Sequence, residues 1–184
     1  MEMMRDGRQG REAFMQRRLI VMRHAKSSWG SEAASDHERP LNDRGRTEAP
    51  RVAAMLAERQ WQPEYVLSSD ARRTRETFEL MQEVWTDEVP VEFLRALYLA
   101  GYHGLMAASG LIPEEASTIM LLGHNPGLEE VVYLLSNHSL ALKTAMAVLL
   151  ENESDTWPDA LLSLRTWRVV DVLRGRLPKE EHGD

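Results

Sequence analysis

Short runs of apolar residues recur along the 184-residue chain, separated by polar segments or by segments with helical periodicity. Apolar runs without polar alternation are typical of strands that are buried on both faces of a parallel sheet. Strands are predicted at 19–22, 65–68, 89–93, 117–122, 145–150 and 167–173. The last of these runs alternates apolar and polar side chains.

Apolar residues between these runs repeat at helical spacing. Helices are predicted after Asn42, over 71–84, and from Pro126 through Leu135. The segments 25–39 and 151–159 are polar and are expected to be loops. Strands that alternate with helices predict an α/β fold, a three-layer α/β/α sandwich with a mostly parallel central sheet.

Pro50 leaves two interpretations of the first helix. The helix can begin after an Asn42 cap and contain the proline, or it can begin near Thr47 with the proline in its first turn. The periodicity of the apolar residues does not distinguish them.

The bulk composition fits one globular domain, with 43% hydrophobic and 28% charged residues. We assign this domain to 17–178, with 1–16 as a flexible lead-in and 179–184 as a tail. The net charge of -7 argues against a partner that is a nucleic acid or an anionic membrane, but a local arginine cluster can still bind a small anion.

The chain contains no cysteine, which excludes disulfides, thiolate metal sites and a cysteine nucleophile. Its apolar stretches are shorter than the roughly 18 residues that span a bilayer. The first 16 residues lack the apolar centre of a secretory signal, so we expect a cytoplasmic protein. No residue spacing indicates a metal site or a cofactor, and the oligomeric state is not readable.

Reactive and basic side chains follow three of the predicted strands. Arg23 and His24 follow the first, Arg73 lies shortly after the second, and His124 follows the fourth. Open α/β sheets bind ligands beyond the carboxyl ends of their strands, so these side chains are expected to meet at one rim. Arginine forks match phosphate oxygens, and a neutral imidazole beside arginine is a suitable nucleophile.

Four ordered segments of the chain resemble the histidine phosphatase (phosphoglycerate mutase-like) superfamily. They read L-I-V-M-R-H-A-K at 19–26, R-P-L-N-D-R-G at 39–45, L-S-S-D-A-R-R-T-R-E-T at 67–77 and L-L-G-H-N-P-G-L at 121–128. Together they are similar to the small SixA-type branch, the phosphohistidine phosphatases. The resemblance runs from about residue 18 to 173 and implies the phosphoglycerate mutase-like fold.

The resemblance implies a role for each matching position. His24 would accept the phosphoryl group, Arg23 and Arg73 would clamp its oxygens, and His124 would bind them as a second histidine. Lys26 and Asn125 are further candidates for substrate binding. Arg72 adjoins Arg73 and is the alternative for the second clamp; a surface ion pair of Arg73 with Glu76 or Glu79 is the other reading.

The proton donor of the larger superfamily members is missing from its expected position. They carry a glutamate three residues before a tyrosine, whereas counting back from Tyr98 gives Arg95. An imidazole leaving group accepts its proton from solvent, but an alkoxide needs an acid. The missing acid therefore favours a phosphohistidine substrate. Asp36, His37 and Asp70 remain alternative donors.

The predicted function is a phosphatase that forms a phosphohistidine intermediate and dephosphorylates a phosphorylated protein. A phosphomonoesterase on a small metabolite, a non-catalytic phosphate-binding module and, more weakly, a mutase are the alternatives. Ser69 is expected to cap a helix rather than act as a nucleophile. Arg39 and Arg44 either position the loop over the site or form solvated salt bridges. Trp29 either covers the pocket or is an exposed surface residue.

Overall fold

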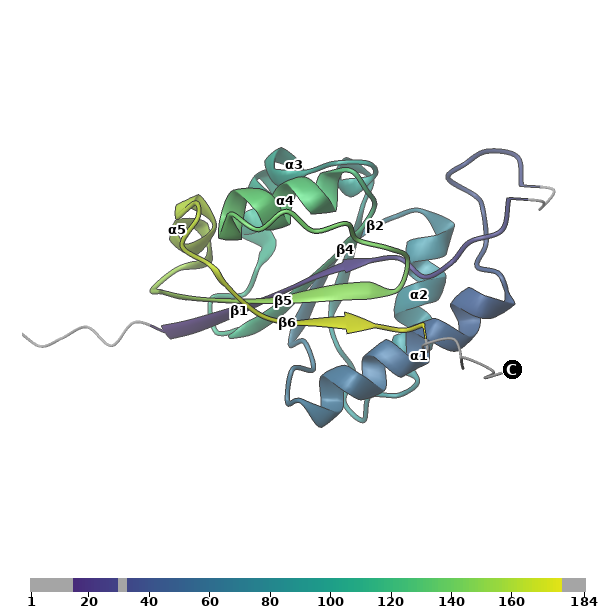
Figure 1. Cartoon of the computed structure of the whole chain (residues 1–184), viewed down its shortest axis with the longest axis horizontal. Coiled ribbons are helices and arrows are strands. Elements are labelled where there is room, and N and C mark those ends of the chain that lie inside the picture. Colours follow the sequence, from purple (N-terminus) through teal and green to yellow (C-terminus); the bar gives the residue numbers. More distant parts are fainter. Residues whose placement is uncertain (1–14, 30–32, 177–184) are drawn as a thin grey trace, which may run out of the picture.

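A computed structural model describes residues 15–29 and 33–176 and shows a six-stranded sheet between two layers of helices (Figure 1). The strands are β1 (Met15–Arg23), β2 (Tyr65–Ser69), β3 (Val91–Leu94), β4 (Thr118–Gly123), β5 (Met146–Ser154) and β6 (Arg168–Arg174). The α-helices are α1 (Asp43–Glu58), α2 (Arg72–Gln82), α3 (Tyr102–Ala108), α4 (Gly127–Ser136) and α5 (Trp157–Leu162). The three-layer α/β/α prediction is confirmed.

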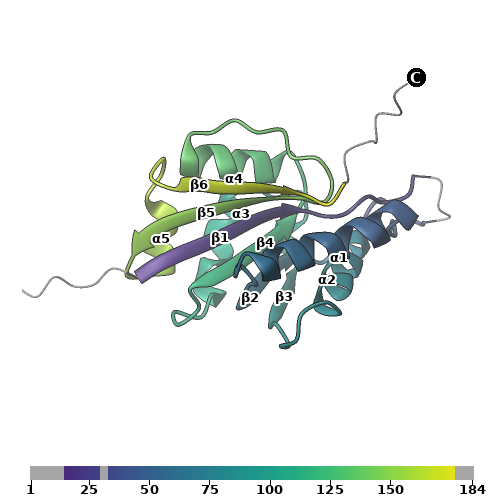
Figure 2. The same cartoon turned by 60° about the horizontal axis from the view of Figure 1, so that its bottom comes forward.

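The strand order is β3-β2-β4-β1-β5-β6, which Figure 2 shows across the width of the sheet. Strands β3, β2, β4 and β1 pair in parallel, whereas β5 pairs antiparallel with both β1 and β6. In the part of the chain that the structure describes, β5 is therefore the one strand that runs against the others. The prediction of a mostly parallel sheet holds.

Alternate side chains of β1 enter two separate hydrophobic clusters, one on each face of the sheet. Leu19 and Val21 pack under α3, α4 and α5, while Ile20 and Met22 pack against α1 and α2. All four side chains are fully buried. Burial on both faces explains why the run reads as continuously apolar in the sequence.

The first helix begins directly after Asn42, whose Oδ1 accepts a hydrogen bond from the Gly45 N–H at 3.0 Å. Pro50 lies inside this helix, so the first of the two interpretations holds. A Cβ on Gly45 would lie 2.2 Å from the carbonyl oxygen of Lys26. Glycine is therefore required where the helix touches the chain segment that follows β1.

The structure departs from the sequence predictions most clearly at β1, β5 and α3. Strand β1 begins at Met15, two residues inside the expected lead-in, while 1–14 and 177–184 lie outside the described residues. Strand β5 extends to Ser154 and α5 follows, so the segment 151–159 is not a loop. Polar residues suit the end of β5 because its side chains there are partly exposed. Helix α3 was not predicted.

None of the helices in the described part of the chain has the length and apolarity that a bilayer crossing requires.

Arg17 stabilises the end of the sheet that lies away from the strand exits. Its side chain is fully buried, lies 5.4 Å from the ring centroid of Trp157, and donates to the carbonyl oxygens of Glu114, Ala116 and Ser154 at 2.7, 3.1 and 3.3 Å. One arginine thus satisfies several backbone acceptors that are shielded from water.

We expect Arg17→Ala to lower the free energy of unfolding by about 2 to 4 kcal/mol, because it leaves buried carbonyl groups unpaired. Arg18→Ala is the matched control, since the Arg18 side chain is 32% exposed, and should cost less than about 1 kcal/mol. Urea unfolding followed by circular dichroism measures both. Equal losses would contradict the role assigned to Arg17.

Candidate active site

The carboxyl ends of β1, β2 and β4 deliver the predicted side chains to one cavity of about 200 Å³. His24 directly follows β1, and its backbone continues the sheet. The His24 N–H donates to the Gly123 carbonyl, and the His24 carbonyl accepts from the Ala145 N–H, both at 3.1 Å. The backbone that carries the imidazole is therefore held by the end of β4 and by the residue that precedes β5.

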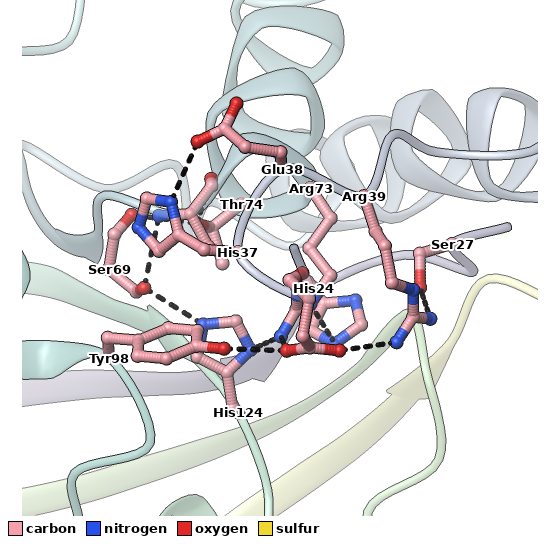
Figure 3. A network of polar contacts seen from close by, with 12 residues as sticks. His24, Ser27, His37, Glu38, Arg39, Ser69, Arg73, Thr74, Tyr98 and His124 are labelled. Atoms are coloured by element: carbon pink, nitrogen blue, oxygen red, sulfur yellow. Dashed lines mark hydrogen bonds and ion pairs between the residues drawn. The ribbon is translucent and has the colours of Figure 1, made fainter. Parts of the chain in front are cut away.

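The Arg73 guanidinium joins the two histidines in the floor of this cavity. Its Nε–H donates to His24 Nε2 at 3.3 Å, and one Nη2–H donates to His124 Nδ1 at 3.2 Å. The two rings have centroids 5.1 Å apart. Figure 3 shows His24, Arg73 and His124 pointing toward one another, with Tyr98 beside His124. All three residues of the floor are at least 94% buried.

These contacts define the tautomer of each ring. Because arginine only donates, His24 Nε2 and His124 Nδ1 must both be acceptors. His24 then carries its proton on Nδ1, which donates to the Ala25 carbonyl at 2.7 Å. His124 carries its proton on Nε2, which donates to Ser69 Oγ at 2.8 Å. The unprotonated nitrogen of His24 is the one that faces Arg73.

Both imidazoles are neutral near pH 7. Burial holds the pKa of His24 well below 6.5, and the positive charges of Arg73 and Arg23 act in the same direction. Burial and then the Arg73 charge lower the pKa of His124 to about 3. The expectation that arginine neighbours favour the neutral imidazole agrees with these directions, although desolvation is the larger cause.

Helix α2 separates Arg73 from its neighbour Arg72. Arg73 is 4% exposed, whereas the Arg72 side chain is 52% exposed and pairs with Glu76 at 2.7 Å. The Thr77 hydroxyl donates to the Arg73 carbonyl and accepts from the Ala25 N–H. This threonine thus connects the helix to the segment that follows His24.

The remaining predicted residues line the same cavity with different partners. Arg23 donates to the Leu142 carbonyl at 2.8 Å, and its Nε is buried without a partner among the described residues. Asn125 Nδ2 donates to Glu129 and to Leu142, so the buried Oδ1 is left as a free acceptor. Lys26 is half-buried at the wall.

Asp36 connects Arg73 to the loop that closes one side of the cavity. Its carboxylate accepts from Tyr98 Oη and Arg39 Nη1, both at 2.6 Å, and from Arg73 Nη2 at 3.0 Å. The Tyr98 hydrogen bond and then those of Arg39 and Arg73 lower the pKa of Asp36 to about 2. An ionised Asp36 is no proton donor in the free site at neutral pH.

His37 and Asp70, the other candidate donors, bond to each other at 2.7 Å and lie outside the cavity lining. Arg39 lies in the lining, where it stacks 3.7 Å from the centroid of Trp29. Arg44 pairs with Glu48 and is not part of the lining.

Two site residues were missed or misassigned from the sequence. Ser69 was expected to cap α2, but the helix begins after Ala71, which has no side-chain cap. The Ser69 hydroxyl instead holds His124. The contact of Tyr98 with Asp36 has no signal in the sequence, because 62 residues separate them. The position of Ser69 at a strand end, four residues before Arg73, was the available signal.

Within 15–29 and 33–176, no group of three or more His, Asp or Glu side chains is arranged as a metal site. The site is therefore a cationic cavity whose floor holds two neutral imidazoles and one guanidinium.

The comparisons with known proteins agree with this geometry. The family profile of the histidine phosphatase superfamily (branch 1) matches residues 19–98. An uncharacterized chloroplastic protein of Arabidopsis thaliana is 41% identical over 153 residues, which cover 78% of this chain and 70% of that protein. The chain belongs to the histidine phosphatase superfamily, and its activity class is that of a phosphatase.

Solved structures place the fold within the SixA type. The Agrobacterium tumefaciens protein assigned as phosphohistidine phosphatase SixA matches with a TM-score of 0.71 and 26% identity, over 85% of this chain and 97% of that one. The protein histidine phosphatase SixA complexed with tungstate matches with a TM-score of 0.70 and 20% identity, over 86% and 97%. The predicted phosphoglycerate mutase-like fold is confirmed.

The two ring tautomers are directly measurable. At about pH 5.5, below the ordinary histidine pKa, we expect both rings to remain neutral because their folded pKa values are lowered. Nitrogen-15 NMR should show the Nδ1–H form for His24 and the Nε2–H form for His124. His24→Ala and His124→Ala each assign one ring. An imidazolium signal from either ring at that pH would contradict the described hydrogen bonds.

Proposed function

We propose that this chain is a protein phosphohistidine phosphatase in which His24 Nε2 accepts the phosphoryl group. The observation that carries the proposal is the Arg73 guanidinium, which lies between an unprotonated His24 Nε2 and the second histidine. A phosphoryl group that takes the place of the Arg73 Nε–H at this nitrogen would have a nucleophile on one side and cationic donors around its oxygens.

The hydrogen bonds of His24 suit an attacking imidazole. As Nε2 bonds to phosphorus, positive charge develops on the ring, and the Nδ1–H bond to the Ala25 carbonyl stabilises it. The same bond fixes the plane of the ring. Water then attacks the phosphohistidine in a second in-line step and restores the free imidazole.

Arg23, Arg73 and His124 would surround the phosphoryl oxygens. The unpartnered Arg23 Nε is a donor available for one of them. In the free site His124 Nδ1 is an acceptor, so it must gain a proton before it can donate to an oxygen. A phosphoryl anion nearby raises the pKa of His124 and favours that proton.

The choice of phosphohistidine rests on the groups that can assist the leaving group. Among the described residues, Asp36 is the one carboxyl side chain of the cavity lining, and this carboxyl is ionised in the free site. A nitrogen leaving group needs no acid from the protein, whereas an alkoxide does. The assignment of the Agrobacterium tumefaciens protein as a phosphohistidine phosphatase supports the same substrate class.

Substrate profiling tests the proposal. We expect purified protein to hydrolyse a phosphohistidine protein with a higher kcat/KM than sugar phosphates at the same enzyme concentration. Brief incubation followed by denaturation should trap an acid-labile, alkali-stable phosphoryl group on His24, and His24→Ala should abolish it. Predominant activity on sugar phosphates would reject the phosphohistidine assignment, and absence of any phosphoenzyme would reject the nucleophile.

Arg73→Ala should lower kcat by roughly 10² to 10³, because it removes one preorganised donor that stabilises the charge of the transition state. Arg72→Ala is the matched control on the same helix and should change kcat less than about threefold, since its side chain faces solvent. Steady-state kinetics with p-nitrophenyl phosphate compares the two. A loss below about fivefold for Arg73→Ala would show that another group clamps the phosphoryl oxygens.

A further inference from the structure

The lining that the structure describes is cationic and contains one carboxylate. Among the lining residues that the structure describes, Asp36 is the acidic side chain, and Arg23, Lys26, Arg39 and Arg73 are basic. The Asp36 carboxylate shares the Arg73 guanidinium with the two catalytic-site histidines, because Arg73 Nη2 contacts both Asp36 Oδ2 and His124 Nδ1. The anion therefore lies one guanidinium away from the position proposed for the phosphoryl group.

A fixed anion at this place disfavours the binding of phosphate alone. Like charges a few ångströms apart repel, and part of the Arg73 charge is already offset by Asp36, which Arg73 shares with Arg39. The carboxylate is held by Tyr98, Arg39 and Arg73, so its charge and position are both defined. The Asp36 carboxylate can strengthen substrate binding only if the substrate presents a hydrogen-bond donor to it.

Exposure separates the floor of the cavity from its mouth. His24, Arg73 and His124 are nearly buried, whereas the Asp36 side chain is 47% exposed, Trp29 79% and Leu99 54%. A phosphoryl group against His24 occupies the floor, so its leaving group must extend toward the mouth. There it meets Trp29, Leu99 and the Asp36 carboxylate, and the basic side chains Lys26 and Arg39 belong to the same lining.

We infer that Asp36 is a specificity-determining residue, which accepts a hydrogen bond from the ring N–H of a phosphorylated imidazole while the ring lies against Trp29 and Leu99. The inference rests on the proposed function and deepens it. When the phosphorylated imidazole is protonated, its second ring nitrogen carries an N–H on the edge of the ring, and this donor matches a mouth with a carboxylate and apolar side chains. A phosphomonoester of an alcohol has no such donor.

The carboxylate also assists bond cleavage without giving up a proton. When His24 Nε2 bonds to phosphorus, the phosphorus–nitrogen bond of the substrate breaks, and its electron pair stays on the departing nitrogen. If the second ring nitrogen carries a proton, the ring leaves as neutral imidazole rather than as an anion. An anionic Asp36 favours that protonated ring, so no general acid is needed.

Two small substrates test the inference without any contribution from protein docking: phosphoimidazole, which has the second ring nitrogen, and p-nitrophenyl phosphate, which has no donor. We expect Asp36→Asn to lower kcat/KM for phosphoimidazole about 10- to 100-fold more than for p-nitrophenyl phosphate, the range of a hydrogen bond to a charged group. Asp36→Ala should show the same selective loss. Glu38→Gln, in the same loop and bonded to His37 outside the lining, is the matched control and should leave the ratio unchanged.

Inhibition by inorganic phosphate provides a second readout. Because Asp36→Asn removes an anion and frees Arg73, it should bind phosphate at least as tightly as the parent protein does. Weaker phosphate binding together with equal losses on both substrates would show that Asp36 only positions Arg73, and the inference would be wrong. Parent protein that hydrolyses p-nitrophenyl phosphate but neither phosphoimidazole nor phosphohistidine would instead reject the proposed function. Thermal unfolding of each variant separates these results from loss of folding.

Discussion

The site depends on one buried guanidinium. Arg73 bonds to His24 and to His124 through different nitrogens and to Asp36 through a third contact, so a single side chain sets the spacing of both rings and the position of the loop. The planar guanidinium fixes the positions of its three partners better than a lysine would, because the lysine ammonium acts as a point charge. Because arginine can only donate hydrogen bonds, the Arg73 contacts also define which nitrogen of each imidazole is unprotonated.

Burial keeps the two imidazoles neutral, and the position of the histidines in the middle of the sheet causes this burial. His24 and His124 both follow strands from the middle of the sheet, and the backbone of His24 still pairs with the strands on either side. At such a place a histidine is withdrawn from water by the layers above and below it. Desolvation then keeps the ring neutral, and the nearby arginine charges reinforce it.

Local patterns in the sequence were enough for the fold and for the central side chains. Apolar runs and helical spacing predict the fold, because they reflect burial on both faces of the sheet. The carboxyl ends of parallel strands lie at one edge of the sheet, so the sequence predicts that His24, Arg73 and His124 lie together. The network around Asp36 and Tyr98 could not be predicted. These residues lie on segments between regular elements, and their contact depends on the path of two loops, which periodicity does not describe. Helix α3 was missed for a related reason, because it is only seven residues long.

The reversed direction of β5 has a consequence for how the site can diversify. Since β5 runs against β1, its first residues lie at the cavity end of the sheet, and the loop before it contributes Thr144 to the cavity lining and the Leu142 carbonyl that accepts from Arg23. This part of the wall precedes β5, which runs antiparallel to β1 and is not one of the strands that the two histidines follow. Changes in loop length that keep the Leu142 and Ala145 contacts can reshape the entrance of the cavity while Arg23 and His24 stay in place.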